Sequence, residues 1–319
     1  MNVIPRENAI NETSVETEME KLVFSSLIAP GKTSEMRSLL LAESIRDFAG
    51  SLAQSQIWII IQGGEEQLSE SVRERLTQLD VKLIPCRFPS EIIRFPLAVL
   101  PFAASISEAK SKDVTEYLAW LGSDTLVLRN PEDFILQNQK AIGVVPVHHT
   151  LVGSLYEEPL DPFWTRIYNF FKISQDHVFP IIAQVDGLKI RPYCNAGHMI
   201  VRPRLNILST WRDSFMKIFQ EPSFQEFFRK DERYAIFLHQ AVLVGVILAA
   251  LAPKKIQILP TKYNYPLHLY EQDVTNNRPG GLEELVTLRY ESFFEDSGWE
   301  KRIPAKDPLK KWLKEKLTR

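Results

Sequence analysis

The first third of the chain alternates between apolar runs and amphipathic stretches, and this alternation limits the possible folds more than any other feature. Apolar runs with the length of buried strands lie at 21–30, 55–64, 81–86 and 116–122. Stretches with apolar residues at helical spacing separate them, at 34–53, 65–80 and 96–110. The run 55–64 is almost continuously apolar, which is typical of a central parallel strand buried on both faces.

Strands that alternate with helices pair in parallel through right-handed crossovers. We therefore predict an α/β fold with a mostly parallel central sheet and helices on both faces. Ligands of such sheets bind at the carboxyl ends of the strands. Asp124 follows the fourth apolar run and is expected at this edge.

Composition excludes several classes of protein. The formal net charge of −2 over 319 residues argues against a general nucleic-acid binder, which has a strongly basic face. Cys86 and Cys194 lie far apart and match no metal-ligand spacing, so we expect reduced thiols and a cytoplasmic protein. Residues 1–20 are polar and acidic, without the apolar core of a signal peptide, and we interpret them as a disordered leader.

The stretch Tyr234–Pro253 approaches the apolar length of a membrane span. His239 and Gln240 interrupt it, and the unbroken apolar part, Ala241–Ala252, has only 12 residues. A span needs about 20 apolar residues, so we expect a buried helix of a large core.

Ser123 and Asp124 stand at the predicted ligand edge, and two interpretations are open. Both are common turn and cap residues. A carboxylate in this place also suits a metal or a diphosphate site, although two carboxylates would hold a divalent ion better than one. The chain has neither the glycine fingerprint of a dinucleotide site nor a phosphate loop.

Four segments together resemble a known family. They are "YLAWLGSDTLVLRNPEDF", "PYCNAGHMIVRP", "FLHQAVLVGVI" and "IQILPTKYNYPL", in this order along the chain. Their pattern resembles the GT-A-fold glycosyltransferases that use nucleotide-diphospho-sugars, in the glycogenin-like branch. The resemblance implies one GT-A-like domain over 21–305, with a nucleotide half at about 21–140 and an acceptor half at about 141–305.

The chain departs from this family at its metal site. The segment around Asp124 is similar to the family's Asp-x-Asp motif, but Gly122 stands where the first aspartate is expected, so the motif is degenerate. The resemblance leaves Asp124 as the candidate ligand for Mn²⁺ or Mg²⁺. Arginine or lysine can replace a metal beside a diphosphate, and the candidates are Lys262, Arg289 and Arg191, each of which could instead be a solvated surface cation.

The resemblance also implies contacts with the sugars. It places Asn195 and Gly197 of the "NAG" stretch at the donor sugar, whereas local chemistry favours a plain turn between two short strands. It makes His239 and Gln240 the candidate catalytic residues, in place of an Asp-Gln pair, although a histidine at a helix start is usually a core or cap residue.

Asp161 and Trp164 are candidate acceptor contacts, because sugar sites combine aromatic side chains with carboxylates. The alternative is a helix over 163–171 whose aromatic residues face the core. At the chain end, residues 306–319 predict a basic amphipathic helix. This helix could contact an anionic membrane surface or dock on the protein through its apolar stripe.

Two functions from different classes follow. The first is a glycosyltransferase that moves a sugar from a nucleotide diphosphate donor to an acceptor that is a glycan, a lipid or a protein, with metal dependence left open. The second is a non-catalytic GT-A-like domain that binds a nucleotide sugar, a glycan or a protein partner. The missing carboxylates motivate the second, and the otherwise intact pattern motivates the first.

Overall fold

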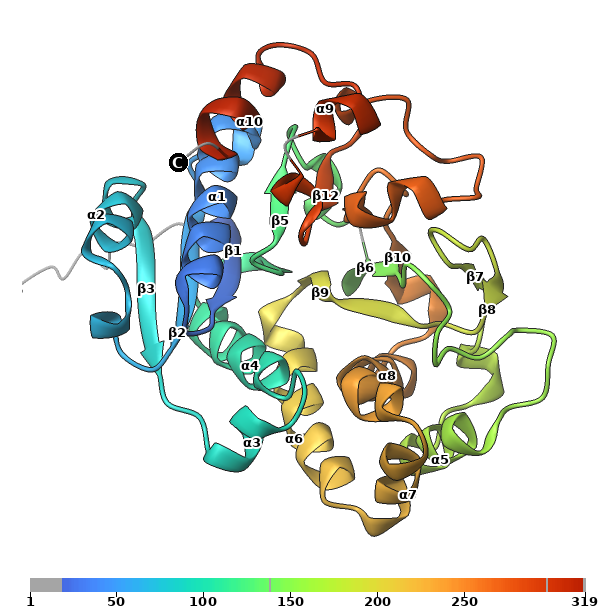
Figure 1. Cartoon of the computed structure of the whole chain (residues 1–319). Helices are drawn as coiled ribbons and strands as arrows, with labels where there is room; N and C mark the ends of the chain where they lie inside the picture. Colours follow the sequence, from blue (N-terminus) through green and yellow to red (C-terminus); the bar gives the residue numbers. More distant parts are fainter. Residues whose placement is uncertain (1–18, 138, 297, 318–319) are drawn as a thin grey trace, which may run out of the picture.

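The computed structural model describes residues 19–137, 139–296 and 298–317, so nearly all of the predicted leader lies outside the described residues. Seven of the described strands form one sheet in the order β10-β6-β9-β4-β1-β2-β3 (Figure 1). Their bounds are β1 Glu20–Ile28, β2 Gln56–Gln62, β3 Val81–Cys86, β4 Thr115–Leu121, β6 Ile142–Pro146, β9 Cys194–Val201 and β10 Ile256–Ile258. Only β9 runs antiparallel to its neighbours, β4 and β6. The predicted mostly parallel sheet is confirmed.

Helices cover both faces of this sheet, as predicted (Figure 1). Those with apolar faces on the sheet or its covering layer are α1 Lys32–Phe48, α2 Glu70–Gln78, α4 Val99–Ser111, α6 Ile207–Phe219 and α8 Glu232–Ala250. The others are α3 Ser90–Arg94, α5 Pro162–Phe171, α7 Pro222–Lys230, α9 Trp299–Arg302 and α10 Leu309–Leu317.

The period-two alternation of a strand divides the core into two layers. On β1, Leu22 and Phe24 pack with α1 and α2, whereas Val23 between them packs on the opposite face with α4, α6 and α8. Both sets are buried, which is why the strand sequences are almost continuously apolar. The hydrophobic pattern therefore specifies a sheet that lies between two layers of helices.

A second, smaller sheet brings distant residues to the end of β4. It has the order β11-β12-β5, with β5 at Thr125–Val127, β11 at Tyr265–Pro266 and β12 at Thr287–Arg289. The strand β5 begins directly after Asp124, and β12 pairs with it antiparallel so that Arg289 is opposite Thr125. The pairing places the end of β12 beside Asp124.

The predicted strand pair around the "NAG" stretch is wrong. Asn195 and Gly197 lie within the single strand β9, which pairs with β4 on one side and with β6 on the other. Hydrogen bonding along both edges outweighs the turn preference of an Asn-Ala-Gly sequence. The remaining two-stranded sheet, β7 Ile181–Ile182 with β8 Lys189–Ile190, lies immediately before β9 in the chain.

Helix α8 contains the long apolar stretch of the sequence. Among the described residues it is the one helix long and apolar enough to span a membrane, and 61% of its apolar window is buried inside the protein. It packs against α5, α6, α7 and β9. The buried helix predicted from the stretch length is the arrangement that the structure shows.

The basic helix α10 docks on α1 (Figure 1). Lys316 Nζ lies 2.7 Å from Glu43 Oε1, and Trp312 Nε1 donates a hydrogen bond of 2.6 Å to Asp47 Oδ2. The apolar residues of α10 are part of a buried cluster with β5 and β12. The docked interpretation is therefore confirmed, and this arrangement gives no support to a membrane contact through the same stripe.

His198 on β9 is an acid-sensitive point in the core. It is fully buried, and neither ring nitrogen has a hydrogen-bond partner in the described part of the chain. Its ring lies edge-on to Phe134, with 5.5 Å between the ring centroids. Burial lowers the pKa of His198 from 6.5 to about 3. The folded protein therefore holds this imidazole neutral at every ordinary pH.

Acid is expected to destabilise the fold through His198. Below pH 6.5 the unfolded chain protonates this imidazole, whereas the folded chain does so only near pH 3, so the unfolding free energy falls across this window as the pH falls. The loss is about 1.4 kcal/mol per pH unit. Urea unfolding at pH 7 and pH 5 should therefore show a loss about 2 kcal/mol smaller in His198→Leu than in the wild type. An equal loss in both proteins would contradict this account.

Candidate functional site

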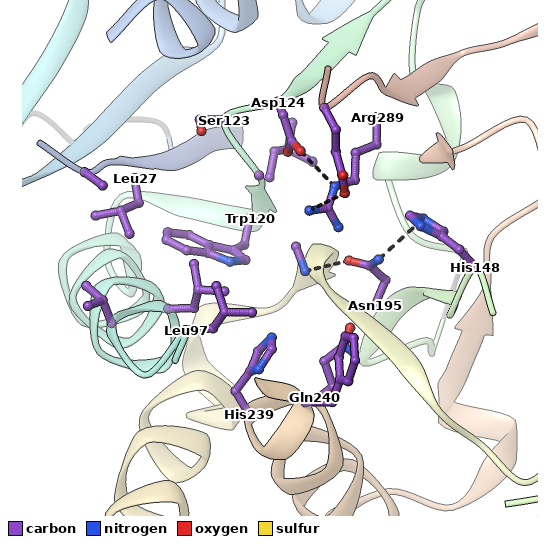
Figure 2. A pocket seen from close by; sticks show the side chains of 18 of the residues that line it. Leu27, Leu97, Trp120, Ser123, Asp124, His148, Asn195, His239, Gln240 and Arg289 are labelled. Carbon is purple, nitrogen blue, oxygen red and sulfur yellow. Dashed lines mark hydrogen bonds and ion pairs between the residues drawn. The ribbon is translucent and has the colours of Figure 1, made fainter. Parts of the chain in front are cut away.

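A cavity of about 610 Å³ opens at the carboxyl ends of β1, β2 and β4. The far side of the cavity comes from the second half of the chain, from β9, α8, β12 and the segments that follow β6 and β11. This is the edge at which open α/β sheets bind ligands. Figure 2 shows Asp124, Arg289, Asn195 and His148 on one side of the cavity and Leu27, Trp120 and Leu97 on the other. Seven predicted site residues line it: Ser123, Asp124, Asn195, Gly197, His239, Gln240 and Arg289.

Asp124 forms an ion pair with Arg289 inside this cavity (Figure 2). Arg289 Nε donates a hydrogen bond of 2.8 Å to Asp124 Oδ2, and Asp124 is only 7% exposed. The backbone also links the two segments, because Asp124 O accepts a bond of 3.1 Å from the amide of Tyr290. Sequence positions 165 residues apart thus meet at the end of β4.

Arg289 is held as a permanent positive charge. Burial by itself would lower its pKa, but the charges of Asp124 and Glu291 outweigh burial, and the net result is a raised pKa. Its second guanidinium nitrogen lies 3.1 Å from Glu291 Oε1. Arg37 of α1 donates a bond of 3.0 Å to the backbone carbonyl of Glu291. Two arginines and two carboxylates, Asp124 and Glu291, therefore form the charged part of the cavity.

A divalent metal ion, which the resemblance implies, does not fit these residues. No three histidine, cysteine, aspartate or glutamate side chains within the described ranges are grouped so as to hold one. The single carboxylate at the motif, Asp124, already binds a guanidinium. At Gly122 a side chain would begin 2.9 Å from Asp124 Oδ1, so a second acid there would crowd the first.

His148 acts as a neutral hydrogen-bond acceptor beside the charged residues. Its Nε2 lies 3.2 Å from Asn264 Nδ2 and 3.4 Å from Asn195 Nδ2, and amide NH₂ groups can only donate. Burial, and then the positive charge of Arg289, hold the pKa of His148 well below its ordinary value. Asn195 Oδ1 in turn accepts a 2.9 Å bond from the amide of Gly197. This network fixes Asn195 in the cavity wall, between Arg289 and Gln240 (Figure 2).

His239 and Gln240 of α8 line the cavity, and hydrogen bonds fix both side chains. Gln240 Oε1 accepts a bond of 3.2 Å from the amide of Ala196, and its Nε2 donates to the hydroxyl of Tyr193 at 3.2 Å. His239 Nδ1 lies 2.9 Å from the carbonyl oxygen of Ile236, so Nδ1 donates and Nε2 is left as an acceptor. Burial lowers the pKa of His239 to about 4, and the ring is neutral at pH 7.

Two predicted cations lie elsewhere. The Lys262 side chain is about half exposed, and its Nζ lies 4.0 Å from Asp133 Oδ2, away from the cavity lining. Arg191 donates to Ser154 Oγ at 2.9 Å and to the carbonyl of Glu158 at 2.7 Å. It therefore holds the loop before α5 and is not directed at the cavity.

The predicted acceptor contacts are also corrected. Asp161 is the N-cap of α5 and accepts a 2.9 Å bond from the amide of Trp164. Trp164 is 1% exposed, and its indole nitrogen donates to the carbonyl of Val152 at 2.6 Å. Neither residue lines the cavity, because α5 turns this face into the core. The core-facing interpretation of these aromatics is the one that holds.

Several lining residues were not predicted from the sequence. They are Arg37, Glu291 and His268, whose Nε2 lies 3.5 Å from Glu291 Oε1. Four of the six histidines of the chain line the cavity: His148, His149, His239 and His268. The histidines could have been indicated from the sequence, by asking which of them follow an expected strand. Arg37 and Glu291 had no such signal.

The sequence model described as the Rhodobacterales glycosyltransferase domain matches residues 26–250, which run from the last residues of β1 to the end of α8 and include most of the cavity lining. The chain belongs to this glycosyltransferase family. No curated protein matches the glycosyltransferase by sequence.

A solved structure gives the glycosyltransferase a GT-A fold. The WbbM bifunctional glycosyltransferase superposes with a TM-score of 0.51 at 12% identity, covering 96% of this chain and 53% of that one. The chain thus spans about half the length of WbbM. Mouse xyloside xylosyltransferase 1 gives a TM-score of 0.47 at 12% identity over 85% of this chain and 97% of that one. GlyE of Streptococcus pneumoniae TIGR4 gives 0.46 at 13% identity over 94% and 64%.

These comparisons confirm the predicted family of GT-A glycosyltransferases and the transferase class. Membership of the glycogenin-like branch stays a prediction, and so does the derivation of Gly122-Ser123-Asp124 from an Asp-x-Asp motif.

Proposed function

We propose that this glycosyltransferase moves a sugar from a nucleotide diphosphate donor to an acceptor hydroxyl, and that Arg289 provides the positive charge which its relatives often take from a metal. The observation that carries the proposal is the buried Arg289–Asp124 ion pair at the end of β4, where the family's donor site is expected. Arg37 lines the same cavity and adds a second cation.

The chemistry needs positive charge at the leaving group. As the bond between sugar C1 and the β-phosphate oxygen breaks, its electron pair stays on that oxygen, and the negative charge of the diphosphate grows. A guanidinium that is already oriented by a carboxylate can donate to this oxygen without reorganisation. Asp124 in this proposal orients Arg289 and keeps it charged.

A second group must take the proton from the acceptor as its oxygen bonds to C1. The cavity contains two carboxylates, and Asp124 is the more deeply buried of them. Glu291 is 40% exposed at its side chain and carries one oxygen, Oε1, that contacts Arg289 and His268. We propose Glu291 as the proton acceptor. The proposal names the donor only as a nucleotide-diphosphate sugar and specifies neither its base nor its sugar. It also places the protein in the cytoplasm.

Donor binding tests the proposal directly. The protein is warmed with UDP-, GDP-, ADP- and dTDP-sugars in the presence of EDTA or of Mn²⁺, and donor hydrolysis is followed in parallel. At least one donor is expected to stabilise the fold and to be hydrolysed equally well in EDTA. Stabilisation that appears only with Mn²⁺ would refute the role of Arg289. No stabilisation by any donor would favour the non-catalytic alternative with a glycan or protein partner.

Glu291→Gln is expected to separate binding from turnover. The amide keeps the shape and the backbone bond to Arg37, but it cannot accept a proton. Hydrolysis of the best donor should fall by about 10²-fold, the usual contribution of a general base, while the stabilisation by that donor changes little. Unchanged turnover in the variant would assign the proton to another acceptor.

A further inference from the structure

The cavity has an apolar rim and a charged floor. The floor consists of Arg37, Asp124, Arg289 and Glu291. Ile93, Leu97 and Leu151 line the cavity and are 47%, 46% and 53% exposed. Figure 2 shows Leu97 on the side of the cavity with Leu27 and Trp120, across from Asp124, Arg289 and His148. Exposed aliphatic side chains that converge on a cavity favour the binding of an apolar group, because such a group removes their apolar surface from water.

The chain holds these side chains outward from anchored positions. Ile92 and Ala98, the residues next to Ile93 and Leu97, are both fully buried. Leu151 stands between Val152, which is 6% exposed, and Thr150, whose amide donates a 2.7 Å bond to Asp186 Oδ2. The exposure of the rim is therefore a fixed feature of well-packed segments.

The backbone at the rim is strained. Leu97 has φ 55° and Leu151 has φ 45°, in the left-handed region that bulky residues rarely adopt. Glu291 on the charged side has φ 44°. Three of the eight non-glycine residues with positive φ in the described chain thus line this one cavity. Backbone strain of this kind is concentrated at active sites and ligand-binding sites.

Polar groups for a nucleoside lie at a different place. Ser34 of α1 and Gln62 at the end of β2 line the cavity where the first two strands end. These side chains suit the hydrogen-bonding edge of a base and the ribose hydroxyls. The apolar rim is then left to the other substrate.

We infer that the acceptor of this glycosyltransferase carries an apolar aglycone, which binds against Leu97, Leu151 and Ile93 while its hydroxyl reaches the charged floor. The inference rests on the proposed function, because it assigns the second substrate of the same cavity. Aliphatic side chains without hydrogen-bonding groups select for such a substrate by burial of apolar surface alone.

The test compares methyl, phenyl and octyl glucoside as probes, below the micelle concentration of the last. Binding is measured by calorimetry on the full chain in the presence of whichever nucleoside diphosphate stabilises it. The octyl or phenyl probe is expected to bind at least about tenfold more tightly than the methyl probe, because most of its extra surface is apolar. A larger gain for octyl indicates a lipid, and a larger gain for phenyl indicates an aromatic aglycone.

Leu97→Asn and Leu151→Asn show whether the rim carries this preference. Asparagine tolerates the left-handed backbone, so both variants are expected to fold at least as stably as the wild type, and the double variant should lose most of the tenfold preference. A purely structural role for these leucines predicts that the double variant keeps the preference for the apolar probes. Leu205→Asn is the matched control, since Leu205 is 44% exposed and lies outside the cavity lining, and it should keep the preference.

Three outcomes would overturn the inference. They are equal binding of all probes, a preference that survives in the double variant, and stabilisation by nucleotide without binding of any glucoside. Each of these leaves the proposed function standing. Failure of the proposed function is recognised separately, by the absence of any stabilisation by nucleotides.

Discussion

Replacement of Arg289 by methionine is expected to lower donor turnover by about 10²–10³-fold, the usual effect of removing one oriented donor to a developing anion. The guanidinium is the group that Asp124 and Glu291 hold in the cavity, and methionine has a similar length without the charge. Turnover is measured as release of nucleoside diphosphate at saturating donor. Arg289→Lys keeps the charge but lacks the planar fork, so an intermediate rate is expected.

Damage to the fold must be separated from loss of chemistry in this experiment. Methionine leaves the buried Asp124 carboxylate without its partner, which is destabilising in itself. The double variant Asp124→Asn with Arg289→Met removes the stranded charge and should recover stability in urea but not turnover. Lys262→Met removes a cation outside the cavity and is expected to leave the rate unchanged. Wild-type turnover in Arg289→Met would end the metal-replacement account.

Trp211→Ala should cost about 3–5 kcal/mol of unfolding free energy, the range for a large aromatic truncated in a core. Trp211 of α6 is fully buried, and its indole nitrogen donates a 2.8 Å bond to the carbonyl oxygen of His239 on α8. The residue thus fills the space between the two helices and also fixes the turn that presents His239. Urea unfolding at pH 7 measures the change.

Trp211→Phe is the comparison that divides the two contributions. The smaller ring keeps most of the packing, but it leaves the His239 carbonyl without this donor, so a loss of about 1–3 kcal/mol is expected. If alanine and phenylalanine cost the same, packing between α6 and α8 contributes little and the hydrogen bond dominates. If neither substitution changes stability, the described packing of Trp211 is wrong.

The first half of the fold follows from local sequence patterns. Continuous apolar runs and helical spacing are strong signals, and β1, β2, β3 and β4 lie within a few residues of the predicted strands. The strand β9 was predicted incorrectly because its Asn-Ala-Gly sequence favours a turn locally. Pairing with β4 and β6, which no local pattern encodes, decides the outcome.

The candidate site also contains some residues that local sequence patterns predict and others that they do not. Asp124 follows a recognisable strand, so its place at the ligand edge could be predicted. Glu291 and Arg37 are 254 residues apart in sequence and meet only through the pairing of β12 with β5. Trp164 and Asp161 have the composition of a sugar site, yet burial of an amphipathic helix accounts for both. Composition alone cannot tell which face of a helix is covered.

The position of β9 also decides how the protein can be divided. This strand comes from the second half of the chain but lies in the sheet between β4 of the first half and β6. A fragment that ended near residue 140 would leave β4 as an unpaired edge, with open backbone groups along an apolar strand. Such edges recruit other chains and aggregate. The two halves of the chain are therefore expected to unfold as one cooperative unit, and we expect that acceptor specificity can be exchanged only through changes in loops and not by grafting a separate module.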